Sequence, residues 1–338
     1  MTVRLPRLSL AMDPNRTQHV LTPQALDRLS QSVEILDTAR ICDFHDASVK
    51  DQLEQTDILL TGWGCPDIGT RELALMPRLK LISHAAGTVK YFLSQAVFER
   101  GITVCSAAEA NAQPVAEFSL AMILLAGKRT FGFRRLYERD RGRSNVEQLQ
   151  SEPFGNLGLT VGIVGASRIG RRVIALLRPF DLDLALFDPF LSPAEAERLG
   201  VRLVPLDELM AISDVISLHA PSLPQTRHMI GAQELARMKN GATLINTARG
   251  ALVDEDALLR ELKTGRIDAV IDVTDPEVPP PDSPFYSLPN VFLTPHIAGA
   301  TGLERARLGD MAIAEIERFC TGRALEQEVR PEHLELIA

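Results

Sequence analysis

The sequence has few cysteines and no clustered metal ligands. Cys42, Cys65, Cys105 and Cys320 lie far apart, so the sequence has neither a C-x-x-C motif nor a disulfide-dense framework. Its seven histidines are equally scattered, and no metal site can be recognised. The cysteine pattern is typical of reduced thiols, and we therefore expect a cytoplasmic protein.

Long apolar runs and a surplus of basic charge are also lacking. The most apolar segment, residues 115–126, is shorter than the roughly 20 residues that cross a bilayer, and it predicts a buried helix. Residues 1–13 contain no apolar run followed by a small-residue cleavage site, so we expect no export signal. The 36 basic and 44 acidic side chains give a net charge of −8, which argues against nucleic acid or anionic membranes as partners.

The length and composition indicate an ordinary globular protein with two domains. The chain has 338 residues, and one domain typically takes roughly 100–200. Apolar residues make up 45% and charged residues 24%, without internal repeats or low-complexity segments, so extended disorder is not expected.

Short apolar runs alternate with helix-compatible stretches in the first hundred residues. This alternation predicts an α/β unit with a parallel sheet. Asn111 is a candidate N-cap for a long helix with Pro114 in its first turn, and it is the candidate domain boundary. The expected strands are 8–12, 33–36, 58–61, 79–83 and 102–105.

A second and more regular strand-helix series follows an arginine-rich stretch, residues 134–152. That stretch indicates either an anion or subunit contact or a solvated helix face. Ser192 and Thr301 open candidate capping boxes, and Asp254 is a candidate N-cap. The helix after Thr301 is expected to end near Thr321 and to pack on the first domain. The expected strands are 160–164, 184–187, 215–218, 243–245, 269–273 and 291–294.

A glycine-bearing turn after the first of these strands predicts a dinucleotide site. Gly165 allows a tight turn, and Gly170 allows close packing of the next helix on the strand. Asp188 follows the second strand, where a carboxylate accepts hydrogen bonds from the adenosine ribose and repels a 2′-phosphate. NAD is therefore favoured over NADP. Ser167 replaces the middle glycine and weakens the motif, which alone could be only a structural turn.

Polar groups follow four strands of the second series, and the carboxyl ends of parallel strands are where ligands bind. Reduction of a 2-keto acid requires a cation for the carboxylate and keto oxygen, which suits Arg249. It also requires a proton donor, which suits His296, and Glu277 would orient the imidazole and favour its charged form.

Each of these three residues also has a structural interpretation. Arg249 could tie strands to a helix, His296 could be a satisfied structural histidine, and Glu277 lies in a Pro-rich loop where acids are commonly solvated. Asp275 is a possible substitute for Glu277. His219 and His228 are interpreted as supporting the backbone or loops rather than as catalytic groups.

These segments resemble the D-isomer-specific 2-hydroxyacid dehydrogenases. The most specific pieces are 162–170, 246–254, 272–277 and 293–299, and the likeness covers nearly the whole chain. It implies two Rossmann-like or flavodoxin-like domains with parallel sheets and a cleft between them. The substrate domain would comprise residues 1–110 and 300–338, the inserted NAD domain residues 111–299, and the protein would usually be a homodimer.

The resemblance also assigns residues. Arg249, Glu277 and His296 match the family's catalytic residues, and Thr247, Asp272 and Gly299 lie where the family contacts nicotinamide. The function implied is NAD-dependent interconversion of a small 2-keto acid and its D-2-hydroxy acid. The full expected NAD-binding set is Gly165, Ser167, Arg168, Ile169, Gly170, Asp188, His219, Pro221, Thr226, Thr247, Ala248, Asp272 and Gly299.

The expected substrate loop departs from the family pattern. Residues 84–90 read His-Ala-Ala-Gly-Thr-Val-Lys, and Lys90 replaces the usual acid. The amides around Ala86, Gly87 and Thr88 are candidates for holding the substrate carboxylate. Lys90 and Trp63 are candidates for substrate specificity, against the alternative that Lys90 is solvated and Trp63 only packs.

Three other functions remain as alternatives. The first is a non-catalytic, NAD-sensing, corepressor-like protein, against which the intact Arg, Glu and His group argues. The others are an NADPH-preferring reductase, disfavoured by Asp188, and a formate-type dehydrogenase, for which no specific loop is visible.

Overall fold

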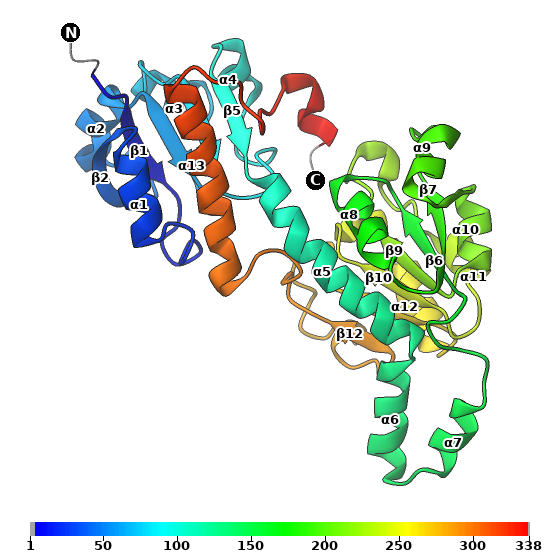
Figure 1. The fold of residues 1–338 in the computed structure, drawn as a ribbon. Coiled ribbons are helices and arrows are strands. Elements are labelled where there is room, and N and C mark those ends of the chain that lie inside the picture. The colour runs from blue at the N-terminus through cyan, green and yellow to red at the C-terminus, as the bar shows by residue number, and fades with distance from the viewer. Residues whose placement is uncertain (1–3, 337–338) are drawn as a thin grey trace. The chain divides into compact units, whose positions relative to one another are not determined.

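A computed structural model describes residues 4–336, which form two compact units (Figure 1). Unit 1 comprises the described residues up to Asn111 together with those from Ala300 onward, and unit 2 is Ala112–Gly299. Unit 1 is therefore built from both ends of the chain, and unit 2 from the middle.

Unit 1 is a five-stranded parallel sheet with the strand order β2-β1-β3-β4-β5. This is the flavodoxin-like order. Its strands are β1 Arg7–Ala11, β2 Glu34–Ile41, β3 Ile58–Thr61, β4 Leu81–His84 and β5 Thr103–Ser106. Its α-helices are α1 Pro23–Ser30, α2 Lys50–Gln55, α3 Thr70–Leu75, α4 Gln95–Glu99 and α13 Ala306–Cys320, with 3-10 turns η1 Ala47–Val49, η5 Gly302–Arg305 and η6 Pro331–Leu336.

Both faces of the unit 1 sheet are covered because successive strand side chains point to opposite faces. Leu8 and Leu10 of β1 pack with α1 and α13, whereas Ala11 of the same strand packs with α2, α3 and α4. The hydroxyl of Ser83 in β4 donates to the carbonyl of Ala312 in α13 at 2.9 Å. The C-terminal helix therefore completes one face of the N-terminal sheet.

Unit 2 is a seven-stranded parallel sheet with the strand order β12-β11-β10-β9-β6-β7-β8, in which the Rossmann order of strands is extended by β12. Its strands are β6 Leu159–Val164, β7 Leu182–Phe187, β8 Arg202–Leu203, β9 Val215–Leu218, β10 Thr243–Asn246, β11 Asp268–Ile271 and β12 Val291–Leu293. Its helices are α5 Ala108–Gly127, which begins in unit 1, α6 Thr130–Asp140, α7 Ser144–Gln150, α8 Arg168–Leu177, α9 Pro193–Leu199, α10 Leu206–Ile212, α11 Ala232–Arg237 and α12 Glu255–Lys263, with 3-10 turns η2 Pro224–Thr226, η3 Gly250–Leu252 and η4 Pro284–Tyr286.

The two faces of this sheet form separate cores. Val161 and Ile163 of β6 pack with α5 and α8, and Ile216 and Leu218 of β9 pack with α10, α11 and α12. The near-continuous apolar strands follow from this double coverage. The predicted fold class, α/β with parallel sheets, is confirmed.

Several predicted element ends are confirmed and others are wrong. Ser192 forms the predicted capping box of α9, and Asp254 caps α12 by accepting the N–H of Ala257 at 3.0 Å. Asn111 is not an N-cap, because α5 begins three residues earlier and the Asn111 side chain instead accepts the N–H of Ala300 at 3.0 Å. Thr301 opens the turn η5, after which α13 begins at Ala306. The two-residue edge strand β8 was not predicted. Two residues are too few to show a strand pattern, and they are extended because they pair with β7.

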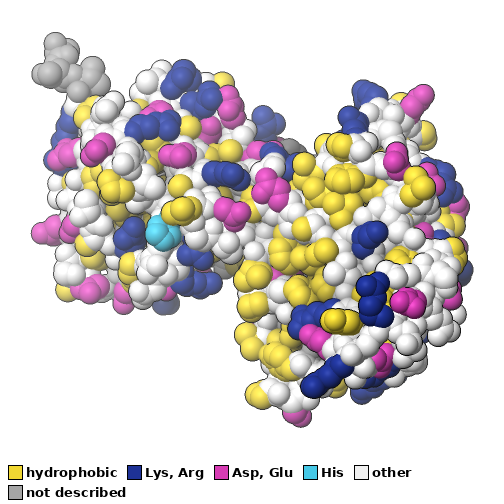
Figure 2. Space-filling model, turned by 60° about the horizontal axis from the view of Figure 1, so that its bottom comes forward, with side chains coloured by type: hydrophobic (Ala, Val, Ile, Leu, Met, Phe, Trp, Pro, Cys, Tyr) yellow, Lys and Arg dark blue, Asp and Glu magenta, His cyan; other side chains and the backbone are white. Residues whose placement is uncertain are grey.

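The arginine-rich stretch forms α6 and α7, which project from the rest of unit 2 (Figure 1). In the described structure neither helix has a buried side chain, and Tyr137 is 60% exposed. Figure 2, which brings this end of the molecule forward, shows Lys and Arg side chains beside hydrophobic ones. No described helix is long and apolar enough to span a membrane.

His84, at the end of β4, makes the stability of unit 1 depend on pH. Its ring is buried against Phe92 and hydrogen-bonded to Thr61 at 2.9 Å, and burial lowers its pKa to about 3. An unfolded chain has the ordinary value near 6.5 and takes up the proton first. The stability contributed by neutral His84 is therefore present above pH 6.5 and is lost as the pH falls toward 3.

We predict that His84 costs the fold about 2 kcal/mol between pH 7 and pH 5, from ~1.4 kcal/mol per pH unit. Denaturant unfolding of the His84→Asn variant should show a smaller loss over this interval than the unsubstituted protein. His19→Asn, which changes an exposed histidine, is the control and should leave the pH dependence unaltered. An equal loss in the His84→Asn variant would contradict the prediction.

Candidate functional site

The expected cofactor-binding and catalytic residues of unit 2 follow the carboxyl ends of its strands. All the strand pairs of this sheet are parallel, so the turns after β6, β9, β10, β11 and β12 lie at the same edge. Each of these turns contains residues that the sequence predicted for the site.

The turn from β6 into α8 provides space for a pyrophosphate. Gly165 has φ +97°, and a Cβ added there would lie 2.8 Å from the backbone of Ala220. A Cβ at Gly170 would lie 2.1 Å from the carbonyl oxygen of Gly165, so the helix and the turn can approach only without a side chain. The first turn of α8, which includes Arg168 and Ile169, directs its N–H groups toward this space.

Ser167, which departs from the glycine motif, has a local role. Its hydroxyl accepts the N–H of Gly170 at 3.3 Å and caps α8. The hydroxyl of Ser167 therefore turns back onto its own helix.

Asp188 lies at the end of β7 and is linked to the same turn. One of its carboxylate oxygens accepts the N–H of Ala166 at 2.7 Å, and the other accepts the N–H of Phe190 at 2.8 Å. Each carboxylate oxygen can accept a further hydrogen bond, so the predicted contact with ribose hydroxyls remains open to Asp188.

The turn after β9 contains His219, Pro221 and Thr226. His219 is buried with its Nε2 hydrogen-bonded to Ser217 at 2.9 Å, and burial lowers its pKa to about 3. Its imidazole is therefore neutral at physiological pH. The hydroxyl of Thr226 donates to the carbonyl of Pro221 at 2.7 Å and accepts the N–H of Leu223 at 2.8 Å, which closes the loop on itself.

The turn after β10 holds Arg249 through a neighbouring side chain that the sequence did not single out. Asn246 accepts the N–H of Ala248 at 3.1 Å and donates to the carbonyl of Arg249 at 2.9 Å. The hydroxyl of Thr247 is hydrogen-bonded to Ser119 of α5 at 3.0 Å. Asn side chains commonly hydrogen-bond to nearby backbone groups in turns. The Asn in the Asn-Thr-Ala-Arg segment could therefore have indicated this role from the sequence.

Gly250, directly after Arg249, packs against the loop that carries Glu277. A Cβ at Gly250 would lie 2.0 Å from the carbonyl carbon of Thr274. The hydroxyl of Thr274 donates to the carbonyl of Glu277 at 3.0 Å. The turns that contain Arg249 and Glu277 are therefore held against each other.

His296 is paired with Glu277. Its Nδ1 and a Glu277 carboxylate oxygen are 2.5 Å apart, and the two side chains are 44% and 59% exposed. Asp275, the possible substitute, instead accepts from Arg227 at 3.0 Å. The exposed side of the imidazole leaves Nε2 as the atom that can reach a substrate.

Asp272 fixes the backbone on both sides of His296. Its carboxylate accepts the hydroxyl of Thr294 at 2.6 Å and the N–H groups of Ile297 at 2.8 Å and Ala298 at 2.9 Å. Its carbonyl accepts the N–H of His296 at 2.8 Å. His296 has φ +53°, in the left-handed region that costs a side chain roughly 1 kcal/mol or more, and these bonds hold it there.

The expected contacts of Asp272 and Gly299 with nicotinamide stay predictions. Gly299 follows the loop that Asp272 anchors, and both Asp272 oxygens already bind the chain. The positioning of His296 by Asp272 was not predicted, since no local pattern relates residue 272 to residues 294–298.

In unit 1, the loop after β4 presents a row of backbone donors. Within the described residues, the N–H groups of Ala86, Gly87, Thr88 and Val89 donate no hydrogen bond. A Cβ at Gly87 would lie 3.6 Å from the side-chain nitrogen of Asn111. Unpaired N–H groups in a turn can donate to an anion such as a carboxylate.

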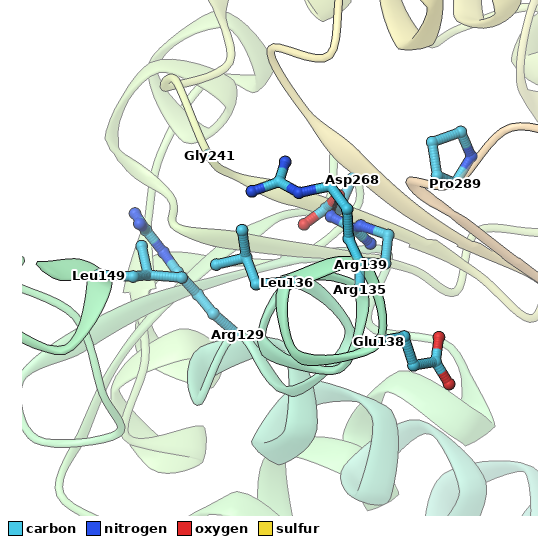
Figure 3. A pocket seen from close by; sticks show the side chains of 10 residues that line it. Arg129, Arg135, Leu136, Glu138, Arg139, Leu149, Gly241, Asp268 and Pro289 are labelled. Carbon is cyan, nitrogen blue, oxygen red and sulfur yellow. Dashed lines mark hydrogen bonds and ion pairs between the residues drawn. The ribbon is translucent and has the colours of Figure 1, made fainter. Parts of the chain in front are cut away.

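A separate pocket of about 710 Å³ lies at the opposite edge of the unit 2 sheet (Figure 3). Asp268, the first residue of β11, and Gly241, just before β10, mark that edge. Arg135 of α6 pairs with Asp268 at 2.8 Å, while Arg129 lies over the ring of Phe154 at 5.0 Å. This pocket contains none of the predicted site residues.

No group of three or more His, Cys, Asp or Glu side chains in residues 4–336 is arranged to hold a metal ion. The glycine turn, the cap of α8 and the carboxylate after β7 together fit a dinucleotide. Fold and site thus define a dinucleotide-binding α/β protein with an Arg, Glu and His group at the carboxyl edge of its sheet.

Comparison with known proteins gives the family. Residues 120–298 match the D-isomer specific 2-hydroxyacid dehydrogenase, NAD binding domain. The chain belongs to the D-isomer specific 2-hydroxyacid dehydrogenase family, as the sequence motifs predicted, and its cofactor is NAD.

Two curated relatives have different activities in their names. The chain is 34% identical over 254 residues to D-3-phosphoglycerate dehydrogenase from Archaeoglobus fulgidus, covering 74% of this chain and 47% of that protein. It is 34% identical over 248 residues to glyoxylate reductase from Korarchaeum cryptofilum, covering 73% of this chain and 74% of that protein. The chain therefore spans only about half the length of the former relative.

Solved structures show the same fold. The NAD complexed form of a D-isomer specific 2-hydroxyacid dehydrogenase from Lactobacillus delbrueckii ssp. bulgaricus has a TM-score of 0.79 at 21% identity, covering 96% of this chain and 100% of that one. D-mandelate dehydrogenase from Rhodotorula graminis has a TM-score of 0.80 at 23% identity, covering 96% and 97%.

Proposed function

We propose that the protein interconverts a small 2-keto acid and its D-2-hydroxy acid with NAD(H). The observation that carries this proposal is the 2.5 Å pair of His296 and Glu277, held by Asp272 at the sheet edge where the dinucleotide turn also lies. A side chain that exchanges protons near neutral pH, oriented by a carboxylate, is the apparatus of a general acid and base.

The proposed roles follow from the chemistry of each side chain. NADH, when bound, supplies the hydride for C2 of the keto acid. Arg249 binds the carboxylate and polarises the keto oxygen through its planar guanidinium. His296 donates the Nε2 proton to that oxygen, because its Nδ1 is engaged by Glu277. Glu277 stabilises the imidazolium before transfer, and in the oxidative direction the neutral imidazole accepts the proton.

The amides of Ala86, Gly87 and Thr88 are proposed to hold the substrate carboxylate as well. Their unpaired N–H groups in unit 1 support this role, because a row of such groups favours an anion. Trp63 and Lys90 remain candidates for recognising the rest of the substrate.

The first test is turnover with a panel of keto acids. We predict that the protein oxidises NADH with at least one of glyoxylate, pyruvate, hydroxypyruvate, phosphohydroxypyruvate or a branched 2-keto acid. Arg249→Ala should lower kcat/KM by at least ~10³-fold, since one oriented charged donor contributes about 10²–10³ and carboxylate binding is lost as well. NADH binding, followed by fluorescence, should stay within about twofold.

An Arg249→Lys variant keeps the positive charge but not the planar guanidinium donors. Its kcat/KM should lie between those of Arg249→Ala and the unsubstituted protein. NADH binding without turnover across the panel would contradict the proposal and favour a non-catalytic, NAD-sensing protein.

A second test concerns the proton donor. Glu277→Gln removes the charge proposed to favour the imidazolium form of His296, so the pH above which keto acid reduction falls should decrease. The measurement is the pH profile of kcat/KM. Asp275→Asn, a matched change in the same loop, should leave the profile unaltered because Asp275 pairs with Arg227. The reverse pattern would make Asp275 the partner of His296.

We further propose that the protein is a cytoplasmic homodimer that associates through α6 and α7. Residues 128–150 contain seven basic and three acidic side chains, a net charge of +4 in a chain of −8. The remaining residues therefore carry −12. Neither helix has a buried side chain in the described structure, and Tyr137 of α6 is 60% exposed, so this face is open to a second copy. The four cysteines, all free, fit a reducing compartment.

Light scattering should give twice the chain mass of 37.1 kDa. Tyr137→Glu, on exposed α6, should shift the protein toward the monomer because it places a charge on the proposed interface. Tyr91→Glu, at a similarly exposed tyrosine of unit 1, is the control and should not change the mass. A monomeric unsubstituted protein would refute the assembly without affecting the proposed chemistry.

A further inference from the structure

Trp63 and Arg305 form a second polar feature at the sheet edge of unit 1. Trp63 follows β3, the strand next to β4, and its carbonyl accepts the N–H of Asp13 at 2.9 Å. Arg305 ends the turn η5, and its guanidinium carbon lies 5.3 Å from the centre of the Trp63 ring. Trp63 packs against the buried cluster of Ala107, Ala110, Ala300 and Leu308, so the ring is a fixed platform for the cation.

The guanidinium of Arg305 has donors to spare. Its Nε is buried and has no hydrogen-bond partner, and in the described part of the chain no carboxylate pairs with Arg305. The neighbouring acid, Glu304, is engaged with the N–H of Thr301 at 3.0 Å. An unsatisfied buried donor costs about 1–3 kcal/mol, and no described side chain offsets that cost for Arg305.

The geometry of the pair determines what it can bind. A cation–π contact occupies the face of the guanidinium, whereas its N–H groups lie in the plane and stay available. These donors match the two oxygens of a carboxylate or phosphate. Arg305 on its tryptophan platform is thus suited to a small anion.

The pair lies near the expected carboxylate loop. Trp63 follows β3 and Ala86 follows β4, and neighbouring strands are about 5 Å apart. Asn111 links the two features. Its Oδ1 accepts the N–H of Ala300, which belongs to the cluster on which Trp63 packs, and its side-chain nitrogen lies near Gly87. A short molecule with one anionic group on the loop amides can place a second at Arg305.

We propose that Arg305, supported by Trp63, selects 2-keto acids that carry a second anionic group, either a carboxylate or a phosphate. The inference rests on the proposed function for the identity of the first group. Arg305 would contact the end of the substrate remote from C2. The loop amides would bind only the carboxylate that all 2-keto acids share, so they would not distinguish one 2-keto acid from another.

The structure offers a direct readout, because Trp63 is the only tryptophan of the chain. Its fluorescence is recorded without NADH while the protein is titrated with 2-oxoglutarate or oxaloacetate for the dicarboxylate class and phosphohydroxypyruvate for the phosphate class. 2-Oxobutyrate is the singly charged comparison. We expect a saturable change with one doubly anionic class at a concentration at least tenfold lower than with 2-oxobutyrate.

Arg305→Gln should weaken the binding of the preferred doubly anionic ligand at least tenfold and leave 2-oxobutyrate within twofold. Arg307→Gln, two residues further on and exposed, is the matched control and should change neither. In turnover assays Arg305→Gln should raise KM for the doubly anionic keto acid with kcat and NADH binding nearly unchanged. Arg305→Lys keeps the charge but not the planar set of guanidinium donors, and its KM should lie between those of the unsubstituted protein and Arg305→Gln.

Equal losses for singly and doubly anionic ligands would make Arg305 merely structural and overturn the proposal, as would a Trp63 signal that does not distinguish them in the unsubstituted protein. This fluorescence comparison needs no variant and no turnover. Absence of turnover with every keto acid would refute the proposed function, while turnover without discrimination by Arg305 would refute only this inference.

Discussion

The buried carboxylate of Asp272 is the interaction on which the candidate site depends. It accepts three hydrogen bonds from residues 294–298, and the same residue's carbonyl accepts a fourth from His296. These bonds stabilise a left-handed backbone at His296 that its side chain would otherwise disfavour. Because β11 and β12 are paired and parallel, the loop after one can be anchored by the residue after the other. The position of His296 thus depends on a residue outside the Arg, Glu and His group.

The sequence predicted the fold where local pattern and tertiary environment agree. Short apolar runs form strands, because the strands of a sheet covered on both faces are apolar along their whole length. Ser192 and Asp254 cap helices as their sequence positions predict. It misplaced the start of α5, because Asn111 has a partner 189 residues away in Ala300 that no local rule reveals. Strand β8 was missed for the same reason: its two residues are extended only because β7 pairs with them.

The site followed the same division. Arg249 and His296 were identifiable because each directly follows a strand, whereas the choice between Glu277 and Asp275 depended on how a proline-rich loop folds. That loop packs on Gly250, a contact between residues far apart in sequence. Ser167 was expected to weaken the dinucleotide motif, and its hydroxyl instead caps the helix that follows the turn. Side-chain direction, which spacing does not encode, decided both cases.

The construction of unit 1 from both ends of the chain has a consequence for biosynthesis. On the ribosome, β1 to β5 emerge before unit 2, and α13 emerges only after all of unit 2. Until then the sheet face with Leu8 and Leu10 lacks the cover that Ile313 and Ile316 provide. Domains generally fold as units in the order of synthesis, and uncovered apolar surface promotes aggregation. The nascent chain therefore completes unit 2 before unit 1, and it carries an open hydrophobic face that chaperones would recognise while unit 2 is being synthesised.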